Sequence, residues 1–352
     1  MIPWLLNWIS STSAASWGPL RLVNSHFFLA TSGFIGSLLT TWVLLPRFWH
    51  RLPRDRGRAY AVEANKSVGK PLSGGLIFVS VFVLMVLLFV PAGATAWYIL
   101  PPLCAAMLLG YYDDKVGGLH EYKLAVVDLV ISLVTVLIIF GAKTSLIWVP
   151  FVSKAFLIPP WVNIPLMTCI IWISINATNC SDGIDGLSGS LTALTLFTLG
   201  AVLYIVTGNA VVAKYLLVPH DAQGASWSLL AFLMVGCVVS YLWYNAAPSL
   251  VLMGDSGSRP LGLLIGILVS VTRNPFFIAI VALVILMNGA TGLVKVAALR
   301  FLRIRILQNI RFPLHDHCRA NLKWSNAQVL VRFVLMHIAF SAVLLALVLK
   351  IR

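Results

Sequence analysis

Charged residues are scarce in this sequence, and acidic residues are the scarcest of them. Only 10% of the 352 residues are charged, whereas 60% are hydrophobic, and the mean hydropathy is +0.94. A soluble domain carries roughly a quarter charged residues. The composition therefore excludes an ordinary soluble protein and indicates a chain that lies largely within a membrane.

Cysteines are also few, and none of the five stands in a CxxC pair. This argues against a soft-metal cluster and against a disulfide framework. The 11 Asp and Glu are outnumbered by 25 Lys and Arg, which gives a formal net charge of +14. We interpret this excess as basic loops that face anionic lipid headgroups, and we expect no nucleic-acid partner, because no aromatic and basic surface module interrupts the apolar runs.

Apolar runs recur along the whole chain and have the length of membrane spans. A membrane-spanning helix needs about 20 mostly apolar residues. The sequence therefore predicts an all-α, polytopic membrane protein of about ten transmembrane helices, with residues 1–352 forming one domain. The predicted spans are 25–46, 73–91, 96–111, 123–141, 161–177, 187–206, 228–247, 259–274, 276–299 and 327–349.

Basic residues gather in the loops at one face of these predicted spans. The loop after the first span and the loop before the last span hold most of them. Apart from charges near the termini, the other face has only Lys143, Lys154, Lys214 and Arg273. Because Lys and Arg are retained in cytoplasmic loops, we expect the basic face to be cytoplasmic and both termini to lie outside.

Nine of the 11 acidic residues fall on the same predicted face, the exceptions being Asp128 within a span and Asp221 outside. Loop charges occur in any membrane protein, but here short connections carry Asp-Asp, Asp-x-x-Asp and Gly-Asp-Ser-Gly. Carboxylates at a membrane boundary are costly and are therefore functional candidates. We expect Asp128 to pair with Lys295 or Arg332 across the bundle.

The segment GYYDD ends the third predicted span with Asp113 and Asp114. Adjacent carboxylates repel each other unless a cation lies between them. The pair therefore suits Mg²⁺-dependent phosphate chemistry or proton acceptance, and an ordinary charge pair at a helix end is the alternative.

The segment NATNCSDGIDGLSG, residues 176–189, places two amides, two carboxylates and three glycines between apolar spans. If a helix begins after Ser181, Asp182 and Asp185 share one face of it. The N–H groups at its start would then favour a bound phosphate. Capping alone needs a single Ser or Asp, so we interpret this segment as a ligand site.

Two further polar segments lie near the predicted cytoplasmic face. In MGDSGS, residues 253–258, Asp255 stands at the start of a span and suits a Mg²⁺ ligand, although it would also serve as a helix N-cap. In PLHDH, His315 and His317 flank Asp316, which suggests a metal site or phosphate contacts, with a solvated turn as the alternative. No third soft ligand accompanies them, which argues against zinc.

The segment NKSVGKPLSGG, residues 65–75, leads into the second predicted span. Its lysines, Lys66 and Lys70, and the backbone amides around them suit a polyphosphate ligand. The spacing is not that of a P-loop, because Gly69-Lys70 precedes a proline. Lysines at a membrane surface are the alternative.

Together and in this order, the motifs resemble those of the polyprenyl-phosphate N-acetylhexosamine-1-phosphate transferase superfamily. The family's NxxNxxDGxDGL pattern is met by residues 176–187 and its MGDxGS pattern by residues 253–258. The Asp-Asp pair and the closing stretch from Trp324 through QVLVRF match too, so the resemblance extends from Lys66 to Phe333. Within the superfamily the chain is similar to the muramoyl-pentapeptide branch. It departs from that branch at Asp316, where a middle histidine is usual, and at GKPLSGG, where GTPTMGG is usual.

The resemblance implies a Mg²⁺-dependent enzyme that moves phospho-MurNAc-pentapeptide from its UDP carrier to undecaprenyl phosphate, giving lipid I and UMP. It implies a multi-pass protein of the bacterial inner membrane, surrounded by membrane lipids, with its active site at the cytoplasmic face. A homodimer is compatible with the sequence, which does not fix the oligomeric state. The residues implied for catalysis are Asp113, Asp114, Asp255 and His315; for the metal, Asp255 and Asp182; and for the substrates, Lys66, Lys70, Lys123, Asn176, Asn179, Asp182, Gly183, Asp185, Asn245 and His317.

Two other functions stay open on the sequence. A sister enzyme would transfer GlcNAc-1-phosphate from UDP-GlcNAc to the same lipid, and a transporter would use the acids as ion ligands. A transporter favours acids at mid-span depth, where only Asp128 lies. A covalent phospho-sugar intermediate on an aspartate is also open, although direct attack is simpler because the lipid phosphate is already nucleophilic.

Overall fold

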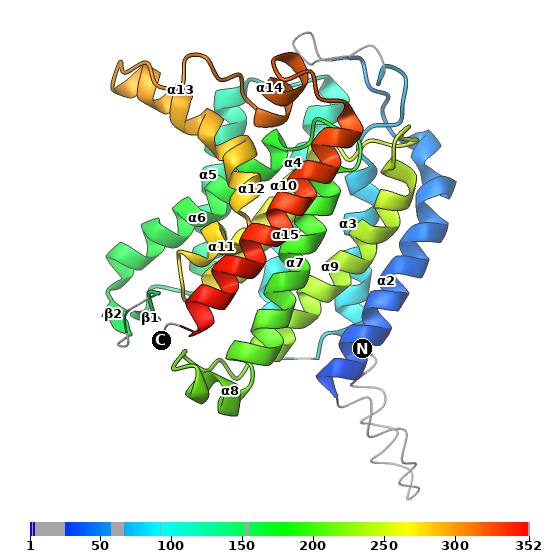
Figure 1. The fold of residues 1–352 in the computed structure, drawn as a ribbon. Helices are drawn as coiled ribbons and strands as arrows, with labels where there is room; N and C mark the ends of the chain where they lie inside the picture. The colour runs from blue at the N-terminus through cyan, green and yellow to red at the C-terminus, as the bar shows by residue number, and fades with distance from the viewer. Residues whose placement is uncertain are drawn as a thin grey trace, which may run out of the picture.

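The computed structural model describes residues 1, 3, 25–57, 67–91, 93–150, 152 and 155–350. Helices dominate these residues (Figure 1), and each of the ten predicted spans coincides with a helix or a helical run. The first elements are α2 (His26–Phe48), η2 (Trp49–Arg51), α3 (Gly74–Phe89), η4 (Thr95–Ile99), α4 (Leu100–Val116), α5 (Glu121–Ile139), β1 (Ser145–Ile147), β2 (Phe156–Ile158), α6 (Pro160–Cys180) and α7 (Leu187–Ala201). They are followed by η5 (Val202–Thr207), α8 (Ala210–Tyr215), α9 (Gly224–Asn245), α10 (Asp255–Val271), α11 (Phe277–Val281), α12 (Leu283–Ile285), η6 (Leu286–Ala290), α13 (Thr291–Phe301), α14 (Leu314–Ala320) and α15 (Asn326–Lys350).

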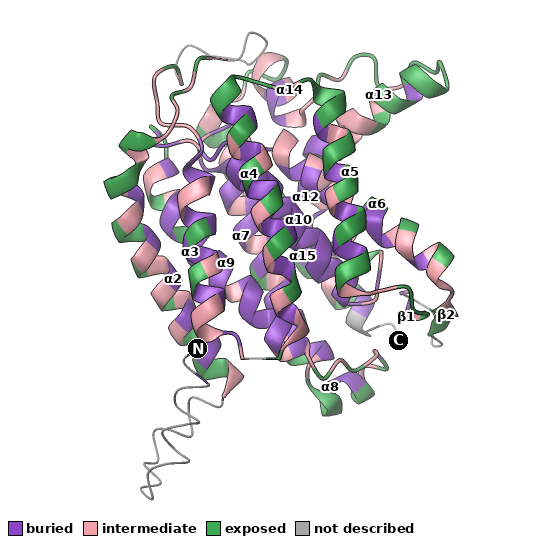
Figure 2. Cartoon of the chain, turned by 180° about the vertical axis from the view of Figure 1, so that it is seen from behind, coloured by how far each residue is buried: buried purple, intermediate pink, exposed green. Residues whose placement is uncertain are grey.

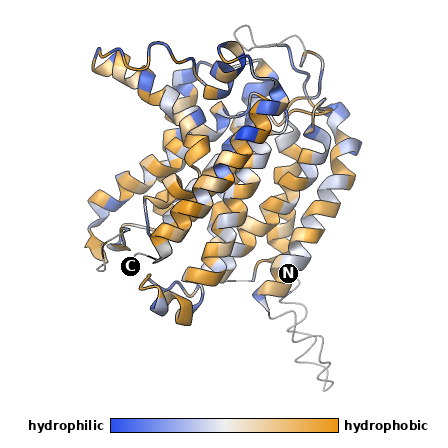
Figure 3. Cartoon of the chain, in the orientation of Figure 1, coloured by the Kyte–Doolittle hydropathy of each residue, from blue (hydrophilic) through white to orange (hydrophobic). Residues whose placement is uncertain are grey.

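Seven helical runs among the described residues are long and apolar enough to cross a membrane. The chain is therefore a multi-pass, all-α membrane protein, as the sequence predicts. Three further helices, α3, α4 and α10, have 16 or 17 residues, fewer than the roughly 20 that a bilayer needs, so the total of about ten spans stays a prediction. Hydrophobic residues cover the helices along their length, and hydrophilic residues gather at the end that carries α14 (Figure 3).

A short hairpin in the connection between α5 and α6 is the exception to the helical fold. Strands β1 and β2 are antiparallel, with Ser145 opposite Ile158 and Ile147 opposite Phe156. The hairpin lies at the end of the bundle opposite to α14, and α2 begins and α15 ends at that same end (Figure 1). An even number of spans would give this arrangement, whereas the side of the membrane on which it lies stays a prediction.

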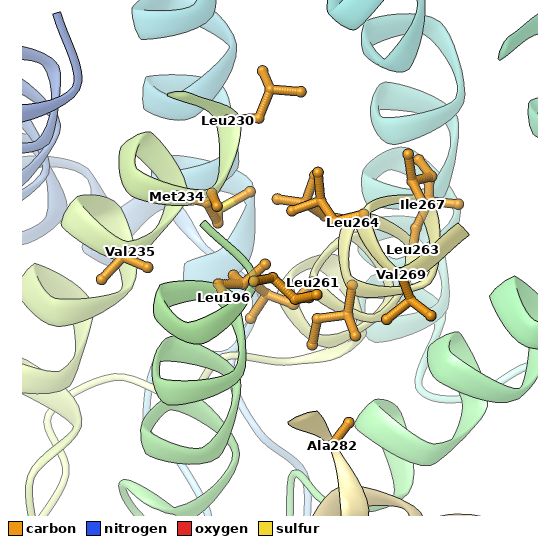
Figure 4. Close-up of a cluster of buried hydrophobic side chains, with 14 of the residues drawn as sticks. Leu196, Leu230, Met234, Val235, Leu261, Leu263, Leu264, Ile267, Val269 and Ala282 are labelled. Atoms are coloured by element: carbon orange, nitrogen blue, oxygen red, sulfur yellow. The ribbon is translucent and has the colours of Figure 1, made fainter. Parts of the chain in front are cut away.

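Helix α10 forms the centre of the bundle. All of its residues are buried, and it packs against α3, α4, α6 and α7 (Figure 2). Figure 4 shows the apolar cluster around it, in which Leu261 of α10 takes part together with Leu196 of α7 and Met234 of α9. A helix that is apolar on every side lies either in lipid or in a protein core, and the contacts of α10 place it in the core.

Two glycines allow α10 to approach α6 closely. A Cβ at Gly262 would lie 2.5 Å from the Ser174 carbonyl oxygen, and one at Gly266 would lie 2.7 Å from the Ile171 Cα. Small residues at a spacing of four let the backbones of two membrane helices come into contact. The first turn of α10, which carries Asp255, is thereby held firmly against its neighbours.

The predicted span 276–299 is not one straight helix. It is divided into α11, α12, η6 and α13, with a break at Ala282 (φ −129°, ψ 21°) and a π-helical turn at η6. In that turn, a Cβ at Gly289 would lie 2.4 Å from the Ala177 carbonyl oxygen of α6. A π-helical turn interrupts the regular ladder and often marks a functional site. Beyond it, α13 leaves the bundle (Figure 1).

Candidate active site

Three carboxylates meet at the end of the bundle that carries α14. Asp113 and Asp114 belong to the end of α4, and Asp255 is the first residue of α10. One oxygen of each lies within 4.8 Å of the others, and each residue is less than a tenth exposed. Two motifs that are predicted to serve one site are therefore in contact.

Two glycines set the distance between these carboxylates. A Cβ at Gly110 of α4 would lie 2.2 Å from the Asp255 carbonyl oxygen, and one at Gly254 would lie 2.3 Å from Asp114 Oδ2. Gly254 also has a φ of +69°. Glycine alone tolerates such close approach and such a dihedral angle without strain.

We expect Gly110→Ala to destabilise the protein by about 1–3 kcal/mol, because the added methyl group overlaps the Asp255 backbone. Thermal unfolding in detergent, followed by circular dichroism, measures the loss. Gly36→Ala in α2 is the matched control, since its nearest new contact would be 3.6 Å away and alanine is the better helix former. Equal melting temperatures for the two variants would contradict the close packing of α4 on α10.

Asp114 caps the first turn of α10. Its Oδ2 accepts hydrogen bonds from Ser73 Oγ at 2.6 Å and from the Ser256 N–H at 3.3 Å, and its Oδ1 accepts one from the Asp255 N–H at 3.1 Å. The first N–H groups of a helix have no partner within it, and a negative charge is favoured there. Asp114 therefore joins α4 to α10, and Ser73, which the sequence motifs did not single out, orients it.

Asp113 is held less tightly than its neighbour. The Leu119 N–H donates to its Oδ1 across a turn in which Gly117 and Gly118 have φ values of +94° and +107°. Within the described residues, one N–H group donates a hydrogen bond to the Asp113 carboxylate, whereas three groups donate to the Asp114 carboxylate. Of the two carboxylates, Asp113 is accordingly the better candidate for contact with a ligand.

Asp255 is bound by two side chains inside the bundle. Asn179 Nδ2 donates to its Oδ2 at 2.9 Å, and Arg259 donates to the same oxygen through Nε at 3.1 Å and Nη2 at 2.9 Å. The remaining Arg259 nitrogen, Nη1, pairs with Asp128 of α5. The site thus contains a buried chain of charges that runs from Asp255 through Arg259 to Asp128.

The partner expected for Asp128 is therefore wrong. Lys295 donates to the Ile310 carbonyl at 2.8 Å, and Arg332 lies over the ring of Trp324. Arg259 is not among the cations that the sequence suggests for Asp128. Its spacing of four from Asp255, which puts both on one side of a helix, and a buried Asp128 in need of a cation could have indicated it.

The carboxylates fit a divalent cation. Within the described part of the site, Asp113, Asp114 and Asp255 lie together, and Asp255 shares the guanidinium of Arg259 with Asp128. The carboxylates there outnumber the paired cations. Buried charges must be neutralised, so this excess of carboxylates favours a bound cation. Mg²⁺ takes oxygen ligands, commonly one or two carboxylates together with substrate phosphates and waters. Asp182 does not belong to the group of three, and its role as a metal ligand stays a prediction.

The segment 69–75 is hydrogen-bonded to the residues that precede α10. The Gly74 N–H donates to the Leu252 carbonyl at 2.8 Å, and the Gly75 N–H donates to the Met253 carbonyl at 3.0 Å. The motif that we interpret as a polyphosphate site is therefore attached to the MGDSGS motif. The N–H groups of its glycines are therefore used for this attachment, whether or not the segment also binds a ligand.

The predicted lysines are placed differently from one another. Lys70 Nζ lies 2.9 Å from Ser249 Oγ and 3.8 Å from Asp185 Oδ2, at the edge of the site. Lys123 is exposed in the first turn of α5, and none of the contacts within the described residues joins it to the carboxylates. Lys66 lies outside the described residues.

The residues of the 176–189 motif are divided between the end of α6 and the connection to α7. No helix begins directly after Ser181, because α7 starts at Leu187. Asn179 reaches Asp255, whereas Asn176 donates to the Trp172 carbonyl at 2.9 Å within its own helix. Asp182 follows α6 and is partly exposed.

Asn245, at the end of α9, joins two loops of the site. Its Oδ1 accepts from the Gly186 N–H at 2.7 Å, and its Nδ2 donates to the Val251 carbonyl at 2.8 Å. Nearby, Asp185 Oδ2 accepts from the Ser249 N–H at 3.1 Å. These bonds hold the 182–186 connection in place, and a direct contact of Asn245 with substrate stays a prediction.

His315 lies over the same connection. A Cβ at Gly183 would be 2.3 Å from its Nε2, and both its backbone N–H and its Nδ1 contact Asn288 Oδ1, at 3.0 and 3.1 Å. Burial lowers the pKa of His315 to about 4, so the ring is neutral at pH 7. His317 is more exposed, and its Nδ1 accepts from the Arg311 N–H at 3.3 Å. Asn288 belongs to the π-helical turn and carries no motif that could have indicated it.

We expect the free energy of unfolding to fall as the pH drops from about 6.5 towards 4, by at most about 3 kcal/mol from His315. In this interval the unfolded chain binds a proton at His315 that the folded protein excludes, so stability rises with pH. Denaturant unfolding at pH 7 and pH 4.5 measures it. His315→Asn should lose less stability over this interval than the wild type, while His50→Asn at an exposed site should behave like the wild type. Identical losses in all three proteins would contradict a neutral, buried His315.

Comparison with known proteins places this site in a family. Residues 96–273, from η4 to the residues just after α10, match glycosyl transferase family 4. Over 339 residues the chain is 42% identical to the phospho-N-acetylmuramoyl-pentapeptide-transferase of Treponema pallidum (strain Nichols), covering 95% of this chain and 93% of the relative. It is 32% identical to the transferase of that name from Campylobacter curvus, covering 91% and 94%, and 30% identical to that from Chlorobium luteolum, covering 97% of both.

Proposed function

Because the chain belongs to glycosyl transferase family 4, we propose that it transfers phospho-N-acetylmuramoyl-pentapeptide from UDP to undecaprenyl phosphate, giving lipid I and UMP in peptidoglycan biosynthesis. Relatives with the name of this transferase match nearly its whole length. The observation that carries the proposal is the buried group of Asp113, Asp114 and Asp255 at one end of an apolar bundle. A nucleotide sugar would reach such a site from the water and a lipid phosphate from the membrane.

The proposed setting is the bacterial inner membrane, with the α14 end of the bundle in the cytoplasm. The basic residues of the loops 47–57 and 300–323 support this orientation, because such residues remain on the cytoplasmic side. The start of α2 and the end of α15 would then lie outside. In this setting the whole chain works as one transferase domain, and the lipid's phosphate meets the carboxylates at the interface.

The reaction brings two anions together. An oxygen of the lipid phosphate attacks the phosphorus that carries the sugar, and a new P–O bond forms. The bond from that phosphorus to the bridging oxygen breaks, and UMP leaves with that oxygen. Phosphoryl transfer depends mainly on positioning and on electrostatic stabilisation. Mg²⁺ held by Asp255 would supply the positive charge that lets the two phosphates approach and UMP depart.

The residues of the chain divide the work between the two substrates. Asp113 orients the lipid phosphate or accepts its proton, because it is the less restrained of the two adjacent carboxylates. Asp114 keeps α10, and with it Asp255, in place. The nucleotide sugar lies against Asn179, Asp182 and Lys70.

His315 suits a contact with a donor on the substrate. Its backbone N–H fixes the Asn288 amide with Oδ1 towards the ring, so Nδ1 carries the ring proton and donates to that oxygen. In the neutral ring, Nε2 is then an acceptor. We therefore expect Nε2 to receive a hydroxyl or amide of the sugar-peptide moiety, rather than a phosphate oxygen as the motif alone suggested.

The substrate assignment is tested with purified protein, undecaprenyl phosphate and Mg²⁺. Either UDP-MurNAc-pentapeptide or UDP-GlcNAc is supplied, and the lipid product is identified by mass spectrometry. We expect product from the muramoyl substrate alone. Product from UDP-GlcNAc alone would reject the assignment in favour of the sister enzyme, and solute flux in proteoliposomes without UMP release would reject a transferase altogether.

A further inference from the structure

The guanidinium of Arg259 lies between two buried carboxylates, Asp255 of its own helix and Asp128 of α5. We propose that Arg259 is a positioning residue that fixes the Asp255 carboxylate for metal and substrate, and that Asp128 anchors it for this purpose. The inference rests on the proposed function for its catalytic consequence, but its consequence for metal binding stands apart from any turnover.

The contacts of Arg259 with Asp255 restrict the orientation of the carboxylate. Nε and Nη2 both donate to Oδ2, at 3.1 and 2.9 Å, and Asn179 Nδ2 donates to the same oxygen at 2.9 Å. Three donors on one oxygen determine how the carboxylate plane is turned, and therefore where its other oxygen points. Partners that hold a metal ligand in this way commonly affect metal affinity as strongly as they affect activity.

Asp128 holds the other end of the guanidinium. It is fully buried in α5 and pairs with Arg259 Nη1, so the arginine is fixed at both ends between α5 and α10. The second oxygen, Asp128 Oδ1, has no hydrogen-bond partner within the described residues, so the carboxylate is committed to the arginine alone. An arginine fork is planar and rigid and can serve two carboxylates at once, which the single ammonium of a lysine cannot do with the same geometry.

Stability alone does not account for this arrangement. Arg259 is 4% exposed in a helix that is otherwise nearly all apolar or small. A buried ion pair gains little over well-packed apolar residues, because both charges lose their hydration. Here the charges lose their hydration one helical turn from Asp255, the proposed metal ligand. The spacing of four residues puts Arg259 and Asp255 on the same side of α10. The position of Arg259 is therefore better explained by its contact with Asp255 than by the packing of α10.

The test compares Arg259→Lys, Asp128→Asn and the matched control Arg273→Lys, which changes an arginine just beyond the far end of α10. Mn²⁺ alone is the metal probe, and its binding to detergent-solubilised protein is measured by electron paramagnetic resonance. We expect Arg259→Lys to weaken Mn²⁺ binding and to lower kcat by about 10- to 100-fold each. KM for the nucleotide sugar should change by less than about threefold, because ground-state binding is not removed. Asp128→Asn should shift both quantities in the same direction by a smaller factor, and Arg273→Lys should shift neither.

Unchanged Mn²⁺ affinity and kcat in Arg259→Lys would overturn the proposal. So would a lower melting temperature with an unchanged kcat per folded molecule, which is the result of a purely structural pair. If Arg259→Lys does not fold, Asp128→Asn decides by the same two measurements. If the wild type releases no UMP, the proposed function fails, and the Mn²⁺ affinities still test the role of Arg259.

Discussion

Asp255→Asn is expected to lower kcat/KM for UMP release by about 1,000-fold or more, which corresponds to about 4 kcal/mol of lost transition-state stabilisation. The amide keeps the shape of the carboxylate and can still accept hydrogen bonds from Arg259 and Asn179. It removes the negative charge that a divalent cation requires. The loss should persist at any Mg²⁺ concentration, and a coupled assay for UMP measures it.

The fold of this variant must be intact for the result to count. Its melting temperature and its elution from a size-exclusion column in detergent are compared with those of the wild type. Asp221→Asn is the matched control, because Asp221 accepts a hydrogen bond from the Gln223 N–H in the connection between α8 and α9, away from the carboxylates. Substantial residual turnover in Asp255→Asn, or restoration at high Mg²⁺, would reject the metal role.

Asp113→Asn is expected to lower kcat by about 100- to 10,000-fold, the range for loss of a positioned acid or base. The variant should fail even with both substrates at saturation, because the lipid phosphate would bind without being correctly oriented or deprotonated. The steady-state rate as a function of undecaprenyl phosphate concentration separates kcat from KM. Little structural change is expected, because within the described residues a single N–H group donates a hydrogen bond to the Asp113 side chain.

A rise in KM alone would show that Asp113 binds substrate without taking part in the chemical step. Asp114→Asn provides the contrast. That carboxylate caps α10 and accepts from Ser73, so the change should lower the melting temperature along with activity. Equal stability losses in the two variants would contradict the division of roles between these adjacent residues.

Helix positions and the meeting of the acidic motifs could be predicted from the sequence, because each follows from local pattern. Apolar runs of about 20 residues determine where the spans lie. Short connections at one face restrict their carboxylates to the same end of the bundle, which is why the sequence predicts Asp113 and Asp255 at one site. Their contact nevertheless depends on Gly110 and Gly254, whose close approaches become visible only in the fold.

Long-range partners could not be predicted in the same way. Asp128 pairs with Arg259, 131 residues away, while the expected partners, Lys295 and Arg332, are engaged elsewhere. A charge pattern shows that a buried carboxylate needs a cation, but not which helix will supply it. Asn288 was missed for the same reason, since an isolated Asn in an apolar run has no pattern that points to His315.

The broken helix near the site shows a second limit. Hydropathy over 276–299 predicts one span, and the run Leu283–Phe301 is indeed apolar enough to cross a membrane. The predicted span is nevertheless broken at Ala282, and the π-helical turn at η6 brings Gly289 against the backbone of α6. An average over a window of residues cannot register such a contact.

Release of UMP from UDP-MurNAc-pentapeptide tests the central claim most directly. Purified protein is supplied with this substrate, with or without undecaprenyl phosphate, in Mg²⁺ or in an excess of chelator. We predict UMP release only when both the lipid phosphate and Mg²⁺ are present, together with an equal amount of lipid-linked product. Release that continues in chelator, or none under any condition for a folded protein, would contradict a Mg²⁺-dependent transfer centred on Asp113, Asp114 and Asp255.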